Sequence, residues 1–365
     1  MTLQLPDFPW DSLEPFALQA KAHPGGLLDL SVGSPVDPTP SVAIKALEYA
    51  AQAPSYPLTA GSQELRSAMV SWWQTHRNTG DLGLDEVIPS IGSKEMVGLL
   101  PTLLGLGAGD VVVIPEIAYP TYAIGAMVAG ATVVTENNPE HWPVESKLVW
   151  INSPSNPTGE VLGLDYLRKA VSRARSLGAV LASDECYAQL YWDVDWSPSL
   201  LDERVTQGDR TDLLALYSLS KQSNLAGYRA GLVAGGDQLI AELLLARKHM
   251  GLIVPSPIQA VMSATLGDAD HVDTQRERYR HRRTVLATAL RSAGFRIDHS
   301  EAGLYLWVTK GQDDWEAVSW FSERGILVAP GSFYGMAGSQ HVRVALTATD
   351  EAVSEAAKRL QASFL

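Results

Sequence analysis

Short apolar segments alternate with longer amphipathic ones between residues 87 and 234, and this pattern constrains the fold more than any other feature. The apolar segments predict strands at 87–91, 111–115, 132–135, 148–152, 180–184, 213–219 and 230–234. The amphipathic segments predict helices at 93–104, 119–129 and 164–177. Apolar strands separated by helices are typical of a mostly parallel sheet that helices cover on both faces. We therefore predict an α/β protein with this sheet in its large domain.

The pattern changes near residue 268, where a second, smaller α+β domain is expected. Helices are predicted at 271–293, 314–323 and 350–363, with strands at 295–298, 304–308, 325–328 and 342–346. A chain of 365 residues is long enough that about two domains are expected. We predict a large domain at 41–267, a small C-terminal domain at 268–365, and an N-terminal segment at 1–40 that contributes to the small domain and the active site.

Composition and charge exclude several classes of protein. Hydrophobic residues make up 46% of the chain and charged residues 19%, which is typical of a globular protein. The net charge of −13 argues against binding to nucleic acid or to an anionic membrane. The single cysteine, Cys186, excludes an internal disulfide and indicates a reducing compartment. Because the chain also shows no signal-peptide pattern and no apolar stretch of membrane-spanning length, we expect a cytoplasmic protein.

Two further kinds of site have little support in the sequence. The glycine-rich run at 105–109 ends a predicted helix and precedes a strand, whereas a dinucleotide-binding fingerprint follows a strand and opens a helix. No metal-binding motif is present, and the eight histidines are scattered along the chain. We therefore predict neither a dinucleotide site nor a metal site.

Four polar features follow predicted strands, where an open α/β sheet binds its ligands. The first ends in Lys221, which could form a Schiff base in a partly desolvated pocket or could be a solvated loop lysine. In the second, Asp184 could pair with a cationic ring nitrogen and Tyr187 could donate a hydrogen bond to the same ring. The alternative for this pair is a capping aspartate beside a packing tyrosine.

The third and fourth features lie at 153–159 and at 92–95. Two prolines and a glycine make the first of these segments stiff, which suits either a plain rigid loop or a fixed amide at Asn156. Ser93 stands at a strand-to-helix junction, where free backbone N–H groups bind phosphate, unless it is only an ordinary cap. Arg229 could complete a cradle for a dianion. Together the four features describe pyridoxal phosphate, a phosphorylated aromatic aldehyde with a basic ring nitrogen.

With these motifs the chain resembles the class I/II aminotransferases of the fold-type-I pyridoxal-phosphate enzymes. The resemblance covers nearly all of the sequence. Its strongest parts are 153–159, 184–187 and 218–221 with 227–229, and the segment 342–344 also matches. It implies a large pyridoxal-phosphate-binding domain, a smaller α+β domain, and amino acids and 2-oxo acids as substrates. It also implies a homodimer with shared active sites.

The family's roles then apply to particular residues. The resemblance implies that Lys221 binds the cofactor's aldehyde and later moves a proton, and that Asp184 keeps the ring nitrogen protonated. Tyr187 and Asn156 would hydrogen-bond the ring hydroxyl, and Tyr119 would stack on the ring. The phosphate-binding residues would be Ser93, Lys94, Ser218, Ser220 and Arg229.

Three residues would meet the substrate's α-carboxylate: Arg343, Asn156 and Gly33. Arg343 would bind the carboxylate through both terminal nitrogens, and Gly33 would let the backbone approach it. Tyr56 would reach the phosphate bound in the neighbouring subunit.

Within the family, the chain looks most like the actinobacterial N-succinyldiaminopimelate aminotransferases of lysine biosynthesis, through the segments at 30–40 and 329–335. The resemblance implies glutamate as the amino donor and N-succinyl-2-amino-6-oxopimelate, a dicarboxylic 2-oxo acid, as the acceptor. Two alternatives stay open. A carbon–sulfur β-lyase would use the same cofactor, and a non-catalytic ligand-binding module would use none of its chemistry.

Overall fold

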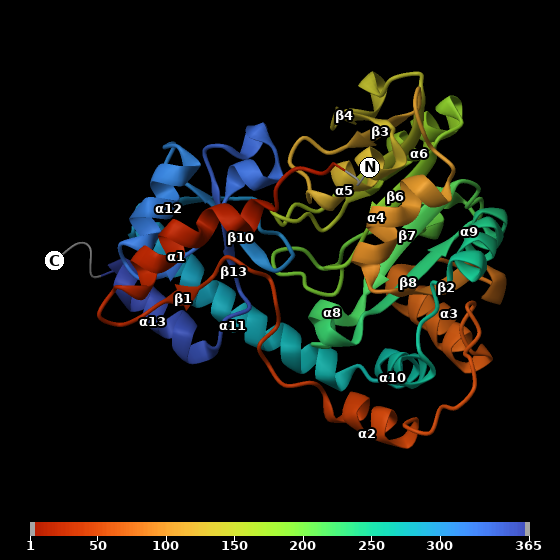
Figure 1. Ribbon diagram of the computed structural model, residues 1–365, viewed down its shortest axis with the longest axis horizontal. Helices are drawn as coiled ribbons and strands as arrows, with labels where there is room; N and C mark the ends of the chain where they lie inside the picture. The colour runs from red at the N-terminus through yellow and green to blue at the C-terminus, as the bar shows by residue number, and fades with distance from the viewer. Residues whose placement is uncertain (1–3, 362–365) are drawn as a thin grey trace.

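A seven-stranded sheet forms the centre of the larger lobe of the computed structural model, which describes residues 4–361 (Figure 1). Its strands are β2 (Val87–Ile91), β3 (Val111–Ile114), β4 (Thr132–Thr135), β5 (Ser146–Asn152), β6 (Val180–Asp184), β7 (Leu213–Ser218) and β8 (Ala230–Gly235). They lie in the order β2-β8-β7-β6-β5-β3-β4, and β8 runs in the direction opposite to that of the other six strands. The prediction of a mostly parallel sheet is confirmed.

The reversed direction of β8 determines which residues lie together at the carboxyl edge of the sheet, where the parallel strands end. Ala230, at the start of β8, pairs with Ile91 at the end of β2, and Gly231 pairs with Ser218 at the end of β7. Asn152 and Asp184, at the ends of β5 and β6, pair with each other. Residues before β8 therefore lie at the same edge as residues that follow the parallel strands.

Helices cover both faces of this sheet. Because side chains alternate along a strand, Leu148 and Trp150 of β5 pack on one face, and Val149 and Ile151 pack on the other. The first face is covered by α4 (Ser93–Leu103), α5 (Thr121–Ala129) and α9 (Asp237–Met250). The second is covered by α2 (Ser41–Tyr49), α3 (Gln63–Arg77), α6 (Leu164–Leu177) and α10 (Ser256–Leu266).

The smaller lobe is built on a four-stranded antiparallel sheet with the order β12-β13-β10-β9. Its strands are β9 (Arg296–Asp298), β10 (Tyr305–Thr309), β12 (Ala329–Pro330) and β13 (Val342–Ala345), and its helices are α11 (Asp270–Ser292), α12 (Asp314–Ser322) and α13 (Asp350–Gln361). Figure 1 shows α11 running from beside the large lobe into the small one. The predicted helix at 350–363 extends past residue 361, outside the described residues.

The single strand predicted at 325–328 is wrong. The structure has β11 (Ile326–Leu327), which pairs in parallel with β1 (Leu28–Asp29), and then the separate β12. The N-terminal chain thus supplies the partner of β11. Leu13 and Leu30 also pack into the small-lobe core, beside helix α1 (Glu14–Lys21). The domain boundaries at 40 and 267 stay predictions.

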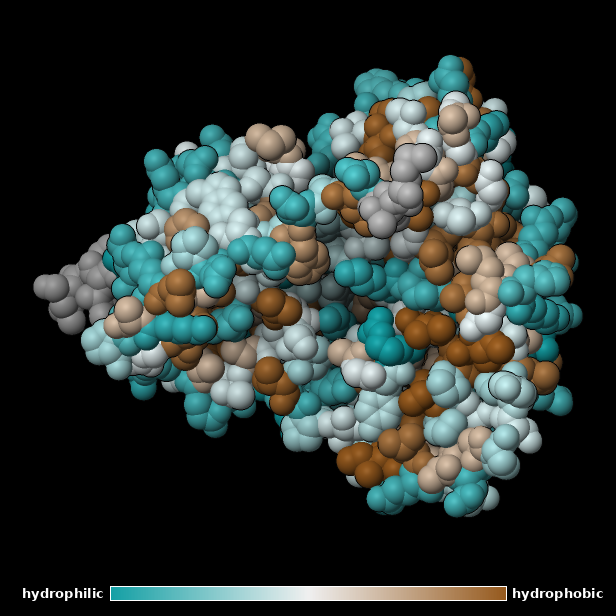
Figure 2. Space-filling model, in the orientation of Figure 1, coloured by the Kyte–Doolittle hydropathy of each residue, from teal (hydrophilic) through white to brown (hydrophobic). Residues whose placement is uncertain are grey.

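The remaining short elements lie in the connections. They are α7 (Glu203–Thr206), α8 (Leu219–Gln222) and the 3-10 helices Pro9–Leu13, Leu84–Glu86, Pro139–His141, Ala226–Tyr228, Gly331–Tyr334 and Met336–Gly338. Between residues 4 and 361, no helix combines the length and the apolar character needed to cross a membrane. Figure 2 shows the surface hollowed where the two lobes meet.

The contact between α4 and α5 generates a stability prediction, because a Cβ at Gly125 would lie 2.9 Å from the Gly98 carbonyl oxygen. Gly125→Ala should lower the free energy of unfolding by about 1–3 kcal/mol, since both helices would have to shift. The matched control is Gly98→Ala, whose Cβ would lie 3.6 Å from its nearest neighbour, in Thr121. Alanine's higher helix propensity should there leave stability unchanged or raise it by up to about 1 kcal/mol. Urea unfolding compares the two, and equal stabilities would contradict this packing argument.

Candidate active site

The carboxyl edge of the large sheet brings predicted residues from three parts of the chain together. Lys221, on α8, donates a hydrogen bond from Nζ to the carbonyl oxygen of Gly33 in the N-terminal segment. Arg343, on β13, donates to Asn156 Oδ1 at 2.9 Å and to the Ser31 carbonyl oxygen at 2.6 Å. The two lobes and the N-terminal segment therefore share one site.

Asp184 is a buried carboxylate at the end of β6. Tyr122 donates its hydroxyl to Oδ2 at 3.0 Å, and the Cys186 backbone N–H donates to Oδ1 at 3.2 Å. Burial raises the pKa of Asp184 above its ordinary value, although these hydrogen bonds act in the opposite direction. Within residues 4–361 no Lys, Arg or His forms an ion pair with it. Such a carboxylate is suited to a ligand that brings its own cationic nitrogen.

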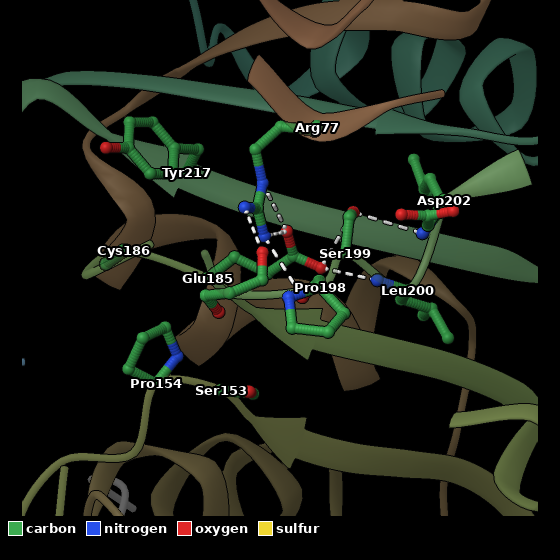
Figure 3. Close-up of polar contacts among 12 residues, drawn as sticks. Arg77, Ser153, Pro154, Glu185, Cys186, Pro198, Ser199, Leu200, Asp202 and Tyr217 are labelled. Atoms are coloured by element: carbon green, nitrogen blue, oxygen red, sulfur yellow. Dashed lines mark hydrogen bonds and ion pairs between the residues drawn. The ribbon is translucent and has the colours of Figure 1, made fainter. Parts of the chain in front are cut away.

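The adjacent residue, Glu185, is a buried carboxylate whose charge is compensated by its neighbours (Figure 3). Glu185 is fully buried, and its Oε2 accepts from Arg77 at 2.6 Å and 3.1 Å. Its Oε1 accepts from Ser199 Oγ at 3.0 Å and from the Leu200 N–H at 2.8 Å. Glu185 therefore has an arginine and hydrogen-bond donors at both carboxylate oxygens. The lack of a cationic partner is specific to Asp184 and is not shared by the adjacent buried carboxylate.

A cradle of donors for an anion lies at the start of α4. Gly92 has φ +71°, and a Cβ there would come within 2.4 Å of the Arg229 guanidinium, so glycine lets Arg229 lie against the helix N-terminus. Ser218 and Ser220 are buried nearby and their hydroxyls are 2.8 Å apart. A guanidinium, hydroxyls and free helix N–H groups are the donors that suit a phosphate.

Ser93 and Lys94 open α4 next to this cradle. Ser93 Oγ accepts a hydrogen bond from the Cys186 thiol at 3.1 Å. Lys94 is exposed, and its Nζ lies 5.9 Å from the centre of the Tyr119 ring. The Tyr119 ring is half-buried and lies 5.9 Å, edge to face, from that of Tyr122.

Two phenols in contact with each other lie beside Arg343, whose guanidinium carbon is 3.9 Å from the centre of the Tyr305 ring. The hydroxyls of Tyr187 and Tyr305 are 3.2 Å apart. Although burial disfavours the phenolate, the nearby charges of Arg343 and Lys221 hold the pKa of Tyr305 below its ordinary value. A Cβ at position 33 would lie 2.0 Å from the Tyr305 hydroxyl oxygen, so Gly33 is required by this close approach.

Tyr56 is the one predicted site residue that stands apart. Its side chain is 98% exposed, and it lies on the irregular segment between α2 and α3. Among residues 4–361 no contact of the Tyr56 side chain places it at the site of its own chain, so its expected role in a neighbouring subunit stays a prediction.

Sequence reasoning missed three residues of this site, which are Tyr122, Tyr305 and Glu185. Tyr122 follows Tyr119 at a helical spacing of three, so a shared face could have been anticipated. Tyr305 lies within an apolar strand whose pattern gives no sign that it meets the site. Among the described residues, no group of three or more His, Cys, Asp or Glu is placed to hold a metal ion.

The chain belongs to the aminotransferase class I and II family, whose sequence pattern it matches over residues 26–360. Enzymes of this family depend on pyridoxal phosphate, and the donor set described above fits that cofactor: an acid for the ring nitrogen, a lysine, and an anion cradle. The protein is therefore a pyridoxal-phosphate-dependent aminotransferase of fold type I.

Named relatives agree with this family. A probable aminotransferase of Mycobacterium tuberculosis is 52% identical, over 99% of this chain and 86% of its own length. The 4-dedimethylamino-4-oxo-anhydrotetracycline transaminase OxyQ of Streptomyces rimosus is 50% identical, over 98% of this chain and 99% of its own. The solved structure of a probable N-succinyldiaminopimelate aminotransferase from Thermus thermophilus superposes with a TM-score of 0.88 at 29% identity, covering 98% of this chain and 100% of that one.

Asp184→Asn is expected to stabilise the cofactor-free protein, because it removes a buried charge that lacks a cationic partner. Since the pKa of Asp184 is raised from 3.8 in the folded state, ionising it costs folding free energy as the pH rises. The gain in melting temperature should therefore be small near pH 3.8 and grow above it.

Asp202→Asn is the control of opposite sign. Although burial opposes ionisation there too, hydrogen bonds from Arg204 and Asn78 hold the pKa of Asp202 below 3.8. The stability that Asp202 contributes is present above that value, so its loss should lower the melting temperature at neutral pH. Melting curves from pH 4 to 8 compare the variants, and a destabilised Asp184→Asn protein would contradict the burial argument.

Proposed function

We propose that this aminotransferase moves an amino group between glutamate and a dicarboxylic 2-oxo acid, and that the acceptor is N-succinyl-2-amino-6-oxopimelate. The observation that carries the aminotransferase chemistry is the meeting of Lys221, Asp184 and Arg343 at one edge of the large sheet. The name of the Thermus relative supports the proposed acceptor.

The cofactor, when bound, supplies an electron sink for negative charge that develops on the substrate's α-carbon. Lys221 Nζ would hold the cofactor's aldehyde carbon and then move the proton at the α-carbon. Asp184 would hold a proton on the ring nitrogen, and the buried Tyr122 hydroxyl would keep that carboxylate oriented. Arg229, Ser218, Ser220 and the N-terminus of α4 would bind the phosphate.

Arg343 would bind the α-carboxylate of the substrate. Its guanidinium is buried, and its Nε has no hydrogen-bond partner within residues 4–361. Among the described residues its only acceptors are two neutral oxygens, Asn156 Oδ1 and the Ser31 carbonyl oxygen. An unpaired buried cation is costly, so an incoming carboxylate would be strongly favoured there. Asn156 would meet the same carboxylate or the ring hydroxyl, and Gly33 would let the backbone come close.

We also propose a cytoplasmic homodimer with shared active sites. The exposed Tyr56 would reach the phosphate in the neighbouring subunit. Large apolar side chains stand exposed on α2 and on the segment after it: Ile44, Tyr49, Tyr56 and Leu58. Figure 2 shows apolar surface on this part of the large lobe, and such patches favour an interface.

A carbon–sulfur β-lyase would need the same electron sink and is the second candidate reaction. The cofactor-binding residues do not separate it from transamination. The products do, since transamination yields a 2-oxo acid and the amino form of the cofactor, whereas β-elimination yields ammonia and pyruvate.

Lys221 is tested by reduction of the purified yellow protein with borohydride. The cofactor should become fixed to the peptide that carries Lys221, and label on another lysine would overturn the assignment. Lys221→Ala should still bind the cofactor but should lower the rate by at least about 10²–10⁴, because the proton carrier is lost. Lys94→Ala, which removes a neighbouring exposed lysine, should retain the covalent label.

The acceptor is tested by comparing kcat/KM for succinylated and free diaminopimelate, aspartate and aromatic amino acids. A site built on polar contacts to the succinyl group should reject the free compound, because its buried polar groups would lose their partners. If aspartate or an aromatic substrate is preferred by tenfold or more, about 1.4 kcal/mol, the proposed acceptor is wrong and the aminotransferase chemistry stands.

A further inference from the structure

We propose that the Tyr334 hydroxyl and the Trp10 indole N–H form a distal subsite, which binds a carboxylate or carbonyl oxygen on the part of the substrate beyond its α-carbon. This inference rests on the proposed function, because it takes the neighbouring Arg343 as the α-carboxylate site. It names side chains that read the far end of the substrate.

The first observation is a buried hydroxyl without a partner. Tyr334 is 2% exposed, and its hydroxyl oxygen makes no hydrogen bond with any described residue. Leaving a buried donor unsatisfied is costly, whereas phenylalanine would keep the same ring contacts at no such cost. Burial raises the pKa of Tyr334, so the hydroxyl is a neutral donor at physiological pH.

The second observation is the position of Tyr334 beside the candidate active site. The Tyr334 ring centre lies 5.0 Å from the Arg343 guanidinium carbon, and its backbone oxygen accepts a hydrogen bond from the N–H of Ala118 at 2.7 Å. Ala118 directly precedes Tyr119, the ring proposed to stack on the cofactor. Tyr334 therefore lies between the cofactor site and the carboxylate site.

A second enclosed donor lies beside it. Trp10 comes from the 3-10 helix Pro9–Leu13, and its indole nitrogen is buried without a partner. Its ring lies 6.3 Å from that of Tyr334, edge to face, and 5.2 Å from that of Phe333. Two neutral donors in an aromatic wall suit an oxygen acceptor carried on a carbon chain.

The contacts of Arg343 indicate that the Tyr334 and Trp10 donors would bind the distal end of the substrate and not its α-carboxylate. Tyr334 and Trp10 approach the guanidinium with their rings, whereas the terminal nitrogens of Arg343 are directed to Asn156 and Ser31. Ser332 also carries a hydroxyl in the 3-10 helix Gly331–Tyr334, but the residue is only partly buried, and its backbone N–H donates to Asp314 at 2.7 Å. Tyr334 is the residue of this 3-10 helix whose hydroxyl is both buried and without a hydrogen-bond partner among the described residues.

The test compares two unreactive acids of equal chain length, glutarate and pentanoate, binding to the cofactor-loaded enzyme by calorimetry. Both carry one carboxylate for Arg343, but only glutarate carries a second at the far end. Wild-type protein should bind glutarate more tightly. Tyr334→Phe should weaken glutarate binding about tenfold, or about 1.4 kcal/mol, and leave pentanoate unchanged.

Trp10→Phe should shift the two affinities in the same way, since it keeps an aromatic ring and removes the N–H. Tyr166→Phe is the matched control. Tyr166 lies on α6, away from the site, and the substitution removes a hydroxyl that donates a hydrogen bond to the Asn137 carbonyl oxygen. It should change neither affinity. Visible absorbance of each variant verifies that the cofactor is loaded.

Three results would overturn the subsite. In the first, the wild-type enzyme binds glutarate no better than pentanoate, or binds neither acid. In the second, Tyr334→Phe leaves the affinity for glutarate unchanged. In the third, Tyr334→Phe lowers the affinity for both acids equally. The last result would assign the hydroxyl to the α-carboxylate. Because the acids do not react, failure of the proposed function is scored separately, by the absence of an amino-group half-reaction with glutamate.

Discussion

Burying a charged side chain is costly unless opposite charge or several hydrogen bonds compensate for it, and this cost determines how the parts of the protein meet. Arg343 is buried in the small lobe, and Asn156 of the large lobe and Ser31 of the N-terminal segment supply its acceptors. Glu185 is buried in the large lobe and is satisfied by Arg77, over a hundred positions away in the chain. The edge of the sheet therefore becomes a site only when all three parts of the chain are folded together.

Some of the buried groups that the protein leaves uncompensated lie near the candidate active site. Asp184 lacks the cation that its neighbour Glu185 has, and this fits a cofactor with a protonated ring nitrogen. The Arg343 Nε, the Tyr334 hydroxyl and the Trp10 indole nitrogen are buried donors without partners among the described residues, and both rings lie near the Arg343 guanidinium. Satisfied groups such as Glu185 thus hold the site in place, and the uncompensated groups beside it fit the proposed ligands.

Much of the fold could be predicted, because strands buried on both faces are continuous apolar runs and the helices between them are amphipathic. One prediction that failed was the single strand at 325–328 in the small lobe. The run at 325–328 is apolar throughout, so its pattern could not show that Ile326–Leu327 pairs with the N-terminal chain while Ala329–Pro330 pairs with β13. Helices α9 and α10 were missed although α9 buries periodic apolar residues, so that omission was not forced by the sequence.

The sequence by itself determined the element types and the chemistry at the strand ends, since an acid, a lysine, an asparagine and an arginine each follow or precede an apolar run. Tertiary structure decided which other residues join them. The direction of β8 brings Arg229 to the same edge as Asp184, and long-range packing brings Tyr122 and Tyr305 to the site. Local patterns report which face of an element is buried, but not what that face meets, because the partner is set by contacts between residues far apart in the chain.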